Sequence, residues 1–322
     1  MSPAIPAEFI TKACYLPHHC VLKISDRITK IRVVFNGSAT LTDGRSLNEN
    51  LLCGQNILPQ LADILTNWRR HRLAVVTDIE KMYSQILVVK RDRDMQRILW
   101  RENASEQVQE YCLNTLTYGL VSAPYLALRV IRQLAEDEQN HFPIGAAVLR
   151  TKTYVDDILT GAQTVNEVRD LIRELINICA AGGFPLKKWA IGSKLLANVV
   201  PGTTQKNPLE WHPAKGHAIL GLRWLPELDA FFFKIDPIPD SVPTKRKIFS
   251  ETAQLFDPLG WLAPVIVRAK ILLQSLWLKK LEWDQPLSQE DQEYWKKFRK
   301  ELPQLKKSPF HAGSRLCRLV AK

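Results

Sequence analysis

Three aspartates in apolar, strand-like surroundings are the residues of this sequence best suited to chemistry. Asp156 and Asp157 interrupt a stretch rich in β-branched and apolar residues, a pattern that predicts a hairpin with both acids at its turn. The flanking runs read as strands: residues 146–149 and 153–155 before the acids, and 158–160 after them. A solvated turn is the alternative, because Asp-Asp is common in turns.

The third aspartate, Asp78, closes a second apolar run, Leu73 to Thr77, which predicts a buried strand. An acid at the end of such a strand needs a partner or a metal ion. Together with Asp156 and Asp157 it could hold two Mg²⁺ ions, with Mn²⁺ as a substitute, since Mg²⁺ prefers hard oxygen ligands. Two ions about 4 Å apart can activate a 3′-hydroxyl and stabilise a leaving pyrophosphate. The predicted chemistry is therefore nucleotidyl transfer.

Several phrases of the sequence, taken in order, resemble reverse transcriptases. Tyr154-Val155-Asp156-Asp157 resembles the catalytic box of that family, and residues 76–83 resemble the box with the first catalytic acid. Residues 117–124 resemble the template and nucleotide-binding box. Further phrases are similar to Pao/BEL-type LTR retrotransposons: residues 15–19, 32–35, 46–48 and 256–260. The resemblance covers nearly the whole chain.

The resemblance implies an α+β right-hand polymerase, with fingers, a palm built on an antiparallel sheet, and a helical C-terminal segment. It places N-terminally truncated fingers and the start of the palm in residues 1–72, and the palm in residues 73–200. A primer-grip-like hairpin and linker would follow in residues 201–243. Residues 244–322 would be a helical thumb and the start of a connection, a segment labelled peptidase-like in this family.

The resemblance also assigns nucleotide-binding residues in the palm. Tyr83, five residues after Asp78, would screen the ribose 2′ position. Tyr118 replaces a glutamine of retroviral enzymes, so its contact would be stacking, with Gly119 allowing close approach. Lys188, with Lys187 as the second choice, would approach the leaving pyrophosphate.

Two cations of the predicted fingers complete this set. Arg32 matches an arginine that grips the triphosphate, and Lys30 is a looser match. A period of two puts both on one strand face, and the guanidinium fork suits phosphate. The family usually has aspartate where this chain has Asn36.

Composition agrees with a nucleic-acid partner. The 322 residues include 44 Lys and Arg against 33 Asp and Glu, a formal net charge of +11. The expected partners are an RNA or DNA template with its primer, a dNTP, and the RNase H and integrase parts of the polyprotein. The sequence shows no signal peptide and no membrane span, and its six scattered cysteines favour reduced thiols. An intracellular location, in a cytoplasmic particle, is expected.

Hydrophobic spacing predicts the remaining elements. Helices are expected at 55–70, from about 124 to 139, and from a capping box at Thr164 to about 181. The stretches 96–100 and 110–113 read as a pair of palm strands. A hairpin is expected at 216–235, followed by helices at 244–256, 262–280 and 288–301. Basic residues after helix 55–70 and at 245–247 are candidates for contact with nucleic acid.

Three other readings are weighed against a polymerase. An aspartic peptidase would need Asp-Thr-Gly or Asp-Ser-Gly, and the nearest match, at Asp257, has proline and leucine instead. An inactive nucleic-acid-binding remnant is the alternative motivated by Asn36. The cluster of Cys14, His18, His19 and Cys20 invites a zinc site, but its spacing fits no usual finger pattern.

Overall fold

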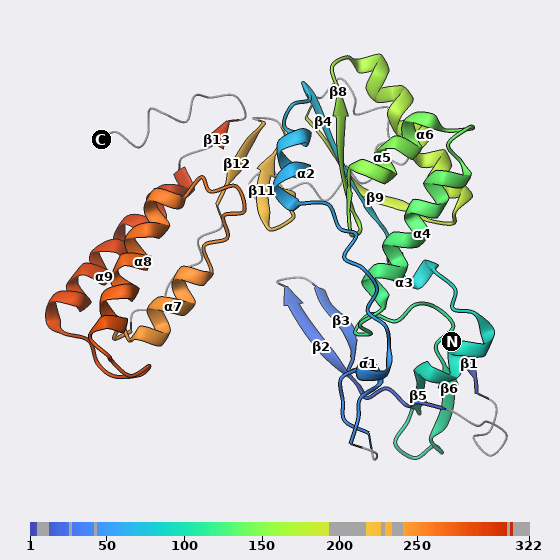
Figure 1. Ribbon diagram of the computed structural model, residues 1–322, viewed down its shortest axis with the longest axis horizontal. Coiled ribbons are helices and arrows are strands. Elements are labelled where there is room, and N and C mark those ends of the chain that lie inside the picture. The colour runs from blue at the N-terminus through green and yellow to red at the C-terminus, as the bar shows by residue number, and fades with distance from the viewer. Residues whose placement is uncertain are drawn as a thin grey trace. The chain divides into compact units, whose positions relative to one another are not determined.

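A computed structural model describes residues 1–4, 13–25, 28–41, 44–192, 217–226, 229–233, 241–307 and 310–311 (Figure 1). The chain forms two compact units, each assembled from separate stretches of sequence. The first unit comprises Met1–Pro59, Thr77–Ile158 and Asp170–Lys187, and the second comprises Gln60–Val76, Leu159–Arg169 and Lys188–Lys322. The domain ranges expected from the sequence stay a prediction.

The first unit contains two small antiparallel sheets. β2 (His18–Ser25) and β3 (Ile28–Phe35) pair as a hairpin, and β5 (Arg97–Trp100) pairs with β6 (Gln109–Cys112). β1 (Ser2–Pro3) occupies the other edge of β6. The predicted pairing of these two strands is confirmed, but the pair forms a separate sheet with β1 and is not part of the sheet that carries the predicted catalytic acids.

Arg97 stabilises the β1-β6-β5 sheet from within. Its side chain is fully buried and forms ion pairs with Asp94 at 2.7 Å and with Glu110 at 2.8 Å. The Tyr15 hydroxyl donates to the same Glu110 carboxylate at 2.6 Å. A buried cation is tolerated only when it is paired in this way, so the network fixes how the N-terminal segment packs on the sheet.

The predicted catalytic acids lie on a four-stranded sheet with the order β7-β8-β4-β9. These strands are β7 (Thr153–Tyr154), β8 (Asp157–Ala162), β4 (Leu73–Ile79) and β9 (Leu186–Ile191). Ala74–Thr77 of β4 and Ile158–Gly161 of β8 are buried without alternation. Continuous burial is expected of strands covered on both faces, and it confirms the buried strand predicted before Asp78.

Three helices follow the nucleotide-binding box: α4 (Ala123–Asp137), α5 (Pro143–Thr151) and α6 (Val165–Ala181). The predicted capping box is confirmed, since Glu167 accepts the Thr164 N–H at 2.9 Å and Thr164 accepts the Glu167 N–H at 3.3 Å. Hydrogen bonds from the Thr164 and Gln163 backbone lower the pKa of Glu167. The strand predicted at 146–149 is wrong, because Pro143 starts a helix there. Shorter helices occur at α1 (Leu47–Asn50), α3 (Met82–Gln85) and η2 (Lys90–Gln96).

In the second unit, α2 (Leu61–Trp68) packs on a small antiparallel sheet. Its strand order is β10 (His217–Ile219), β11 (Leu222–Leu225), β12 (Ala230–Phe232) and β13 (Phe310–His311), so the predicted hairpin is confirmed. α2 is shorter than the predicted helix 55–70 because Pro59 disfavours helix at the residue before it.

Arg69, at the C-terminal end of α2, lies inside this packing. Its guanidinium lies 4.9 Å from the Trp68 ring centroid and 5.3 Å from that of Phe231, and it pairs with Asp229. Asp229 also accepts the Trp224 indole N–H at 3.0 Å. The sequence left open whether this arginine contacts a template; its side chain is nine-tenths buried and faces protein.

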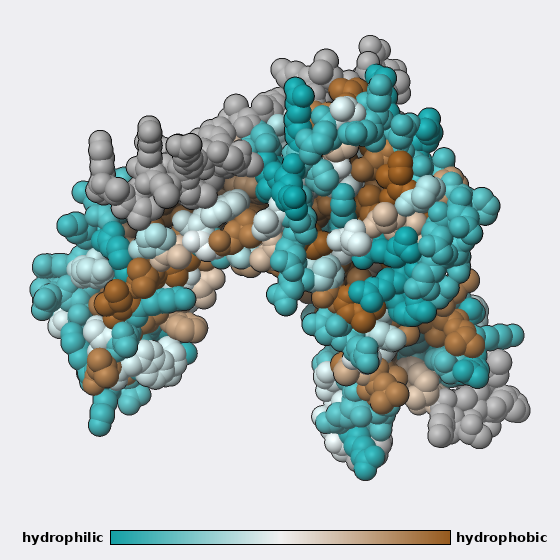
Figure 2. All heavy atoms as spheres, turned by 45° about the horizontal axis from the view of Figure 1, so that its top comes forward, coloured by the Kyte–Doolittle hydropathy of each residue, from teal (hydrophilic) through white to brown (hydrophobic). Residues whose placement is uncertain are grey.

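Helices α7 (Lys245–Ala253), α8 (Ala263–Leu278) and α9 (Gln289–Glu301) follow, and the 3₁₀ helix η4 (Leu302–Lys307) continues α9. Buried Leu272, Leu276, Trp295 and Phe298 form their core. Figure 2 shows apolar side chains at the surface of these helices among hydrophilic ones.

The cations at the start of α7 have partners within the protein. Lys245 is buried between the Trp277 and Trp283 rings, at 4.1 and 5.0 Å, and donates to the Leu281 carbonyl. Arg246 forms two hydrogen bonds with the Asp284 carboxylate. The expectation that these cations bind phosphate is wrong for Lys245, since the aromatic packing encloses it.

The Arg69 interactions generate a stability prediction. Arg69→Ala removes the cation–π contacts and the partner of Asp229, so we expect a loss of about 2 kcal/mol in the free energy of unfolding. The control is Arg70→Ala at the exposed neighbouring position, which we expect to stay within about 0.5 kcal/mol of the parent. Urea unfolding measures both, and equal stabilities would contradict the role given to Arg69.

Candidate active site

The turn that carries the adjacent aspartates is held in a strained conformation. Thr153 pairs with Ile158 and Tyr154 with Asp157, so that Val155 and Asp156 form a two-residue turn between β7 and β8. Val155 has a φ of +56°. A β-branched residue in this region is a rare outlier that costs about 1–2 kcal/mol. Such strain persists only where the surroundings impose it, and it is typical of functional sites.

Asp78 is attached to this turn through the backbone. The N–H of Ile79 donates to the carbonyl of Asp156 at 2.8 Å, so the residue after Asp78 is bonded directly to the strained turn. Asp78, Asp156 and Asp157 are all half-buried. The fold thus brings together the strand ends that carry the three predicted acids.

Metal-binding capacity depends on how these carboxylates are arranged. Among the described residues, no three His, Cys, Asp or Glu side chains form a ready-made ion site. The donor chemistry nevertheless fits a hard divalent cation, because the acids supply carboxylate oxygens only and their partial exposure leaves room for bound waters.

Tyr83 lies within electrostatic reach of this turn. It belongs to the first turn of α3, which follows Lys81 in the left-handed conformation at a φ of +49°. Burial, and then the negative charge of Asp156, raise the pKa of the Tyr83 hydroxyl. The ring is therefore near the acid that sequence reasoning placed in the same site.

A lysine–glutamate pair near the acids was not predicted. Lys187 Nζ lies 2.7 Å from Glu80 Oε2, and the Glu80 N–H donates to the Pro185 carbonyl at 2.8 Å. The Thr77 hydroxyl donates to the Lys187 carbonyl at 3.0 Å. Glu80 stands two residues after Asp78, a spacing that could have drawn attention to it.

Lys188, the preferred lysine of the sequence analysis, is exposed on β9 at a φ of +55°. It belongs to the second unit. Its assignment to the pyrophosphate stays a prediction, whereas the structure gives Lys187 a defined partner beside Asp78.

The nucleotide-binding box is tightly packed around Gly119. This residue has a φ of +93°, and a Cβ there would lie 2.4 Å from the Phe35 carbonyl oxygen. The Tyr118 hydroxyl donates to the Val33 carbonyl at 2.7 Å, and its ring centroid lies 5.4 Å from that of Phe35. The hydroxyl is already hydrogen-bonded and 41% of the residue is exposed, so Tyr118 can offer a ligand its ring more readily than a hydrogen-bond donor.

Asn48 joins the box to the segment before it, a role that sequence reasoning missed. Its amide nitrogen donates to the Gly119 carbonyl at 3.1 Å, and its amide oxygen accepts the Val121 N–H at 2.9 Å. Two hydrogen bonds to either side of Leu120 fix the loop. The phrase Ser46-Leu47-Asn48 contributes to the family resemblance, but the sequence does not show that Asn48 forms hydrogen bonds with this loop.

The cations of the predicted fingers lie on β3. Arg32 is exposed and stands opposite Val21 in the hairpin. The backbone of Lys30 belongs to β3, while its side chain lies outside the described part of the structure. Asn36, which replaces an aspartate of the family, accepts the Ser38 N–H at 3.1 Å in a turn.

The acid of the peptidase-like phrase has a structural role. The carboxylate of Asp257 accepts the backbone N–H of Trp261 at 2.9 Å and that of Leu262 at 2.6 Å, immediately before α8. Both carboxylate oxygens therefore stabilise the backbone at the start of α8.

Among the described helices, none is long and apolar enough to cross a membrane.

Comparison with known families identifies the class of protein. A family model described as reverse transcriptase (RNA-dependent DNA polymerase) matches residues 20–191, more than half of the chain, so the chain belongs to the reverse transcriptase family. A second model, described as a Pao retrotransposon-like RNaseH-like domain, matches residues 244–311. Together the matches identify the reverse transcriptase region of a Pao-type retrotransposon. No curated protein matches the chain.

Solved structures of foamy viral protease-reverse transcriptase share the fold. One, in complex with an RNA/DNA hybrid, is 15% identical with a TM-score of 0.57, over 94% of this chain and 35% of that one. Another, in complex with double-stranded DNA, is 18% identical with a TM-score of 0.58, over 92% of this chain and 45% of that one. This chain thus spans less than half the length of either. The predicted α+β polymerase fold is confirmed.

The geometry of Tyr118 generates a prediction that separates stacking from hydrogen bonding. Tyr118→Phe removes only the hydroxyl, so we expect the KM for a dNTP to change less than about threefold. Tyr118→Ala removes the ring, and we expect the KM to rise about tenfold or more. Steady-state primer extension measures both, and equal effects of the two substitutions would contradict a stacking role.

Proposed function

We propose that this chain is the polymerase part of a retrotransposon reverse transcriptase, transferring nucleotides from dNTPs to a primer 3′-hydroxyl on an RNA or DNA template. One observation carries the proposal: the 2.8 Å hydrogen bond from the Ile79 N–H to the Asp156 carbonyl joins the strand of Asp78 to the strained turn of Val155 and Asp156, which Asp157 follows directly at the start of β8. Membership of a family of RNA-directed DNA polymerases supports it.

In the proposed mechanism, Asp78, Asp156 and Asp157 would hold two divalent ions, Mg²⁺ or Mn²⁺. Such ions would supply activation of the 3′-hydroxyl and neutralisation of the leaving pyrophosphate. Tyr83 restricts the space at the ribose 2′ position, and Tyr118 with Gly119 forms the surface for the incoming nucleotide. Arg32 and Lys30 bind its phosphates.

Lysine near the leaving group can neutralise charge or donate a proton. Lys188 is the residue that the family resemblance favours for this position. The ion pair with Glu80 supports Lys187 as the lysine closer to the acids, at 2.7 Å from a carboxylate two residues after Asp78. Single substitutions of each lysine by methionine separate the two assignments.

The proposed division of labour follows the predicted ranges. Residues 1–72 act as fingers and the start of the palm, residues 73–200 as palm, residues 201–243 as primer grip and linker, and residues 244–322 as thumb and the start of a connection. The chain would work beside RNase H and integrase portions of a polyprotein, in a cytoplasmic particle. The two related structures hold an RNA/DNA hybrid and a DNA duplex, which supports a primer–template partner.

Removing a carboxylate tests the catalytic assignment. Asp78→Asn or Asp156→Asn should lower primer extension at least ~10³-fold, or about 4 kcal/mol of transition-state stabilisation. Affinity for primer–template should stay within about threefold, because phosphate contacts dominate it. The control is Asp92→Asn at an exposed acid of η2, which should leave extension unchanged. Full activity of an Asp78 or Asp156 variant would refute the assignment, and binding without extension by the parent would favour the inactive remnant.

Sugar selection tests Tyr83. Tyr83→Val removes the ring beside Asp156, and we expect the preference for dNTPs over rNTPs to fall about 10–100-fold. Tyr83→Phe keeps the ring and should keep the preference. Single-nucleotide incorporation with each substrate measures the ratio; an unaltered ratio in the valine variant would make Tyr83 a packing residue only.

A further inference from the structure

An asparagine followed by glycine, Asn36-Gly37, comes directly after β3. Asn36 is exposed, and residues 36–39 form a turn in which the Ala39 N–H donates to the Asn36 carbonyl at 3.3 Å. Asparagine is one of the thermolabile residues of proteins. Glycine has no side chain to shield its backbone nitrogen, so this nitrogen can approach the side-chain amide of the residue before it. The pair therefore holds an electrophile and a nucleophile next to each other in the chain.

The turn prepares the Asn36 amide for attack. The Ser38 N–H donates to Asn36 Oδ1 at 3.1 Å, and the ring that this hydrogen bond closes contains both the amide carbon of Asn36 and the nitrogen of Gly37. The same bond stabilises the negative charge that the amide oxygen acquires when its carbon is attacked. Among the described residues, no group accepts the Gly37 N–H, so the nucleophile is not engaged elsewhere.

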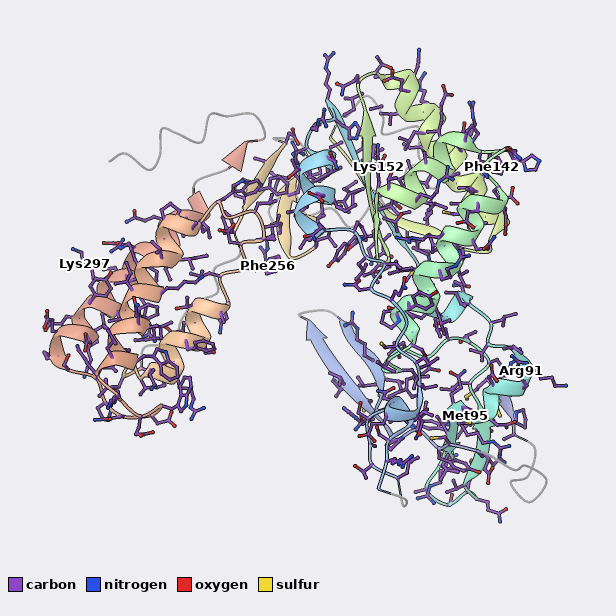
Figure 3. All side chains as sticks on the ribbon, in the orientation of Figure 1. Arg91, Met95, Phe142, Lys152, Phe256 and Lys297 are labelled. Carbon is purple, nitrogen blue, oxygen red and sulfur yellow. The ribbon has the colours of Figure 1, made fainter. Side chains whose placement is uncertain are left out.

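Gly37 is packed against the nucleotide-binding box. A Cβ at this position would lie 2.8 Å from Asn48 Oδ1 and 2.9 Å from the Gly119 carbonyl oxygen, so a larger residue does not fit without a shift. The Gly37 carbonyl accepts the Asn48 N–H at 2.9 Å, and Asn48 Nδ2 donates to Ser38 Oγ at 2.8 Å. The turn follows β3 and lies next to α1, in the blue part of the ribbon in Figure 3. A change in the backbone at Gly37 therefore reaches the loop that Asn48 holds.

We propose that Asn36 and Gly37 form a self-modifying site, at which the asparagine is converted to aspartate and isoaspartate. The Gly37 nitrogen loses its proton to solvent and bonds to Asn36 Cγ, while the bond from Cγ to the amide nitrogen breaks and that nitrogen leaves as ammonia. Water then opens the cyclic succinimide. Cleavage at Cγ gives aspartate, and cleavage at the backbone carbonyl gives isoaspartate. The net reaction consumes water and releases ammonia, with no oxidation or reduction.

The two products differ in their effect on the nucleotide-binding box. Aspartate keeps an oxygen that accepts the Ser38 N–H and adds a negative charge. Isoaspartate lengthens the main chain by a methylene before Gly37, so the Gly37 carbonyl and the Ser38 hydroxyl cannot both stay bonded to Asn48. Because Asn48 fixes Gly119 and Val121, isoaspartate loosens the surface for the incoming nucleotide. This effect rests on the proposed polymerase function, whereas the chemical step does not.

Peptide mass mapping of the full chain, after incubation at mildly alkaline pH, tests the chemical step. Trypsin releases residues 33–45, in which Asn36 is the only asparagine, so a gain of about 1 Da in this peptide identifies its conversion. We expect two products of this mass, one of which co-elutes with the peptide of the Asn36→Asp variant. Conversion should be at least about tenfold faster than at Asn103, an exposed asparagine whose next residue, Ala104, carries a Cβ.

Asn36→Ser is the matched control. Its hydroxyl keeps an acceptor for the Ser38 N–H but has no carbonyl carbon to attack, so its peptide should keep its mass during incubation. In the aged parent, the KM for a dNTP in primer extension should rise at least about threefold once isoaspartate is the main species, because the nucleotide-binding box is displaced. The aged serine variant should extend primers as it does when fresh.

The outcomes separate the modification from the proposed function. An unchanged mass of the 33–45 peptide overturns the inference, and so does equally fast conversion at Asn103. If the chain unfolded in urea converts and the folded chain does not, the turn protects the amide and the inference is overturned as well. Converted protein that extends primers as the fresh parent does overturns the effect on the nucleotide-binding box. A parent that gains the mass but extends no primer, even when fresh, supports the modification and contradicts the proposed function.

Discussion

The candidate site depends on one hydrogen bond, from the Ile79 N–H to the Asp156 carbonyl. This contact holds the strained Val155 turn against the end of β4, where Asp78 lies. A β-branched residue with positive φ would relax in an isolated hairpin, so the buried sheet must impose the conformation. Continuous burial of β4 and β8 supplies that rigidity. The half-buried acids then lie at the edge of a rigid core. Their carboxylates can contact a substrate there and remain partly hydrated.

Positive charge in this protein has two uses, and composition alone does not separate them. Arg97, Arg69 and Lys245 are buried or nearly so, each facing carboxylates, carbonyls or aromatic rings. These cations stabilise packing, because a buried charge is tolerated only with partners. Arg32, Arg70 and Lys188 are exposed instead. Only such exposed cations can meet phosphate, so the surface available to nucleic acid is smaller than the net charge of +11 implies.

Close backbone approach organises both the nucleotide-binding box and the β10–β11 turn. Gly119 lies against the Phe35 carbonyl, and Gly221 lies against the Phe256 ring. In each case a glycine with positive φ and no Cβ allows an exposed aromatic residue to lie beside a fixed loop. The aromatic residue is Tyr118 in the nucleotide-binding box and Phe256 at the β10–β11 turn. Asn48 and Asp257 then hold the adjacent backbone through paired hydrogen bonds. The same device thus serves two surfaces in different units of the chain.

The sequence alone determined what depends on local pattern. Apolar β-branched runs predicted the strands of Asp78 and Asp157, and the Thr164–Glu167 box predicted the start of α6, because these signals act within a few residues. Motifs that resemble those of reverse transcriptases, in the same order along the chain, predicted the class of protein. Local pattern gave the wrong prediction of a strand at 146–149. A short apolar run is compatible with helix and strand equally, and Pro143 starts a helix there. Tertiary structure alone decided which cations are buried, which lysine meets Glu80 and that Phe256 touches Gly221. These contacts join residues far apart in the chain, so no periodicity or spacing encodes them.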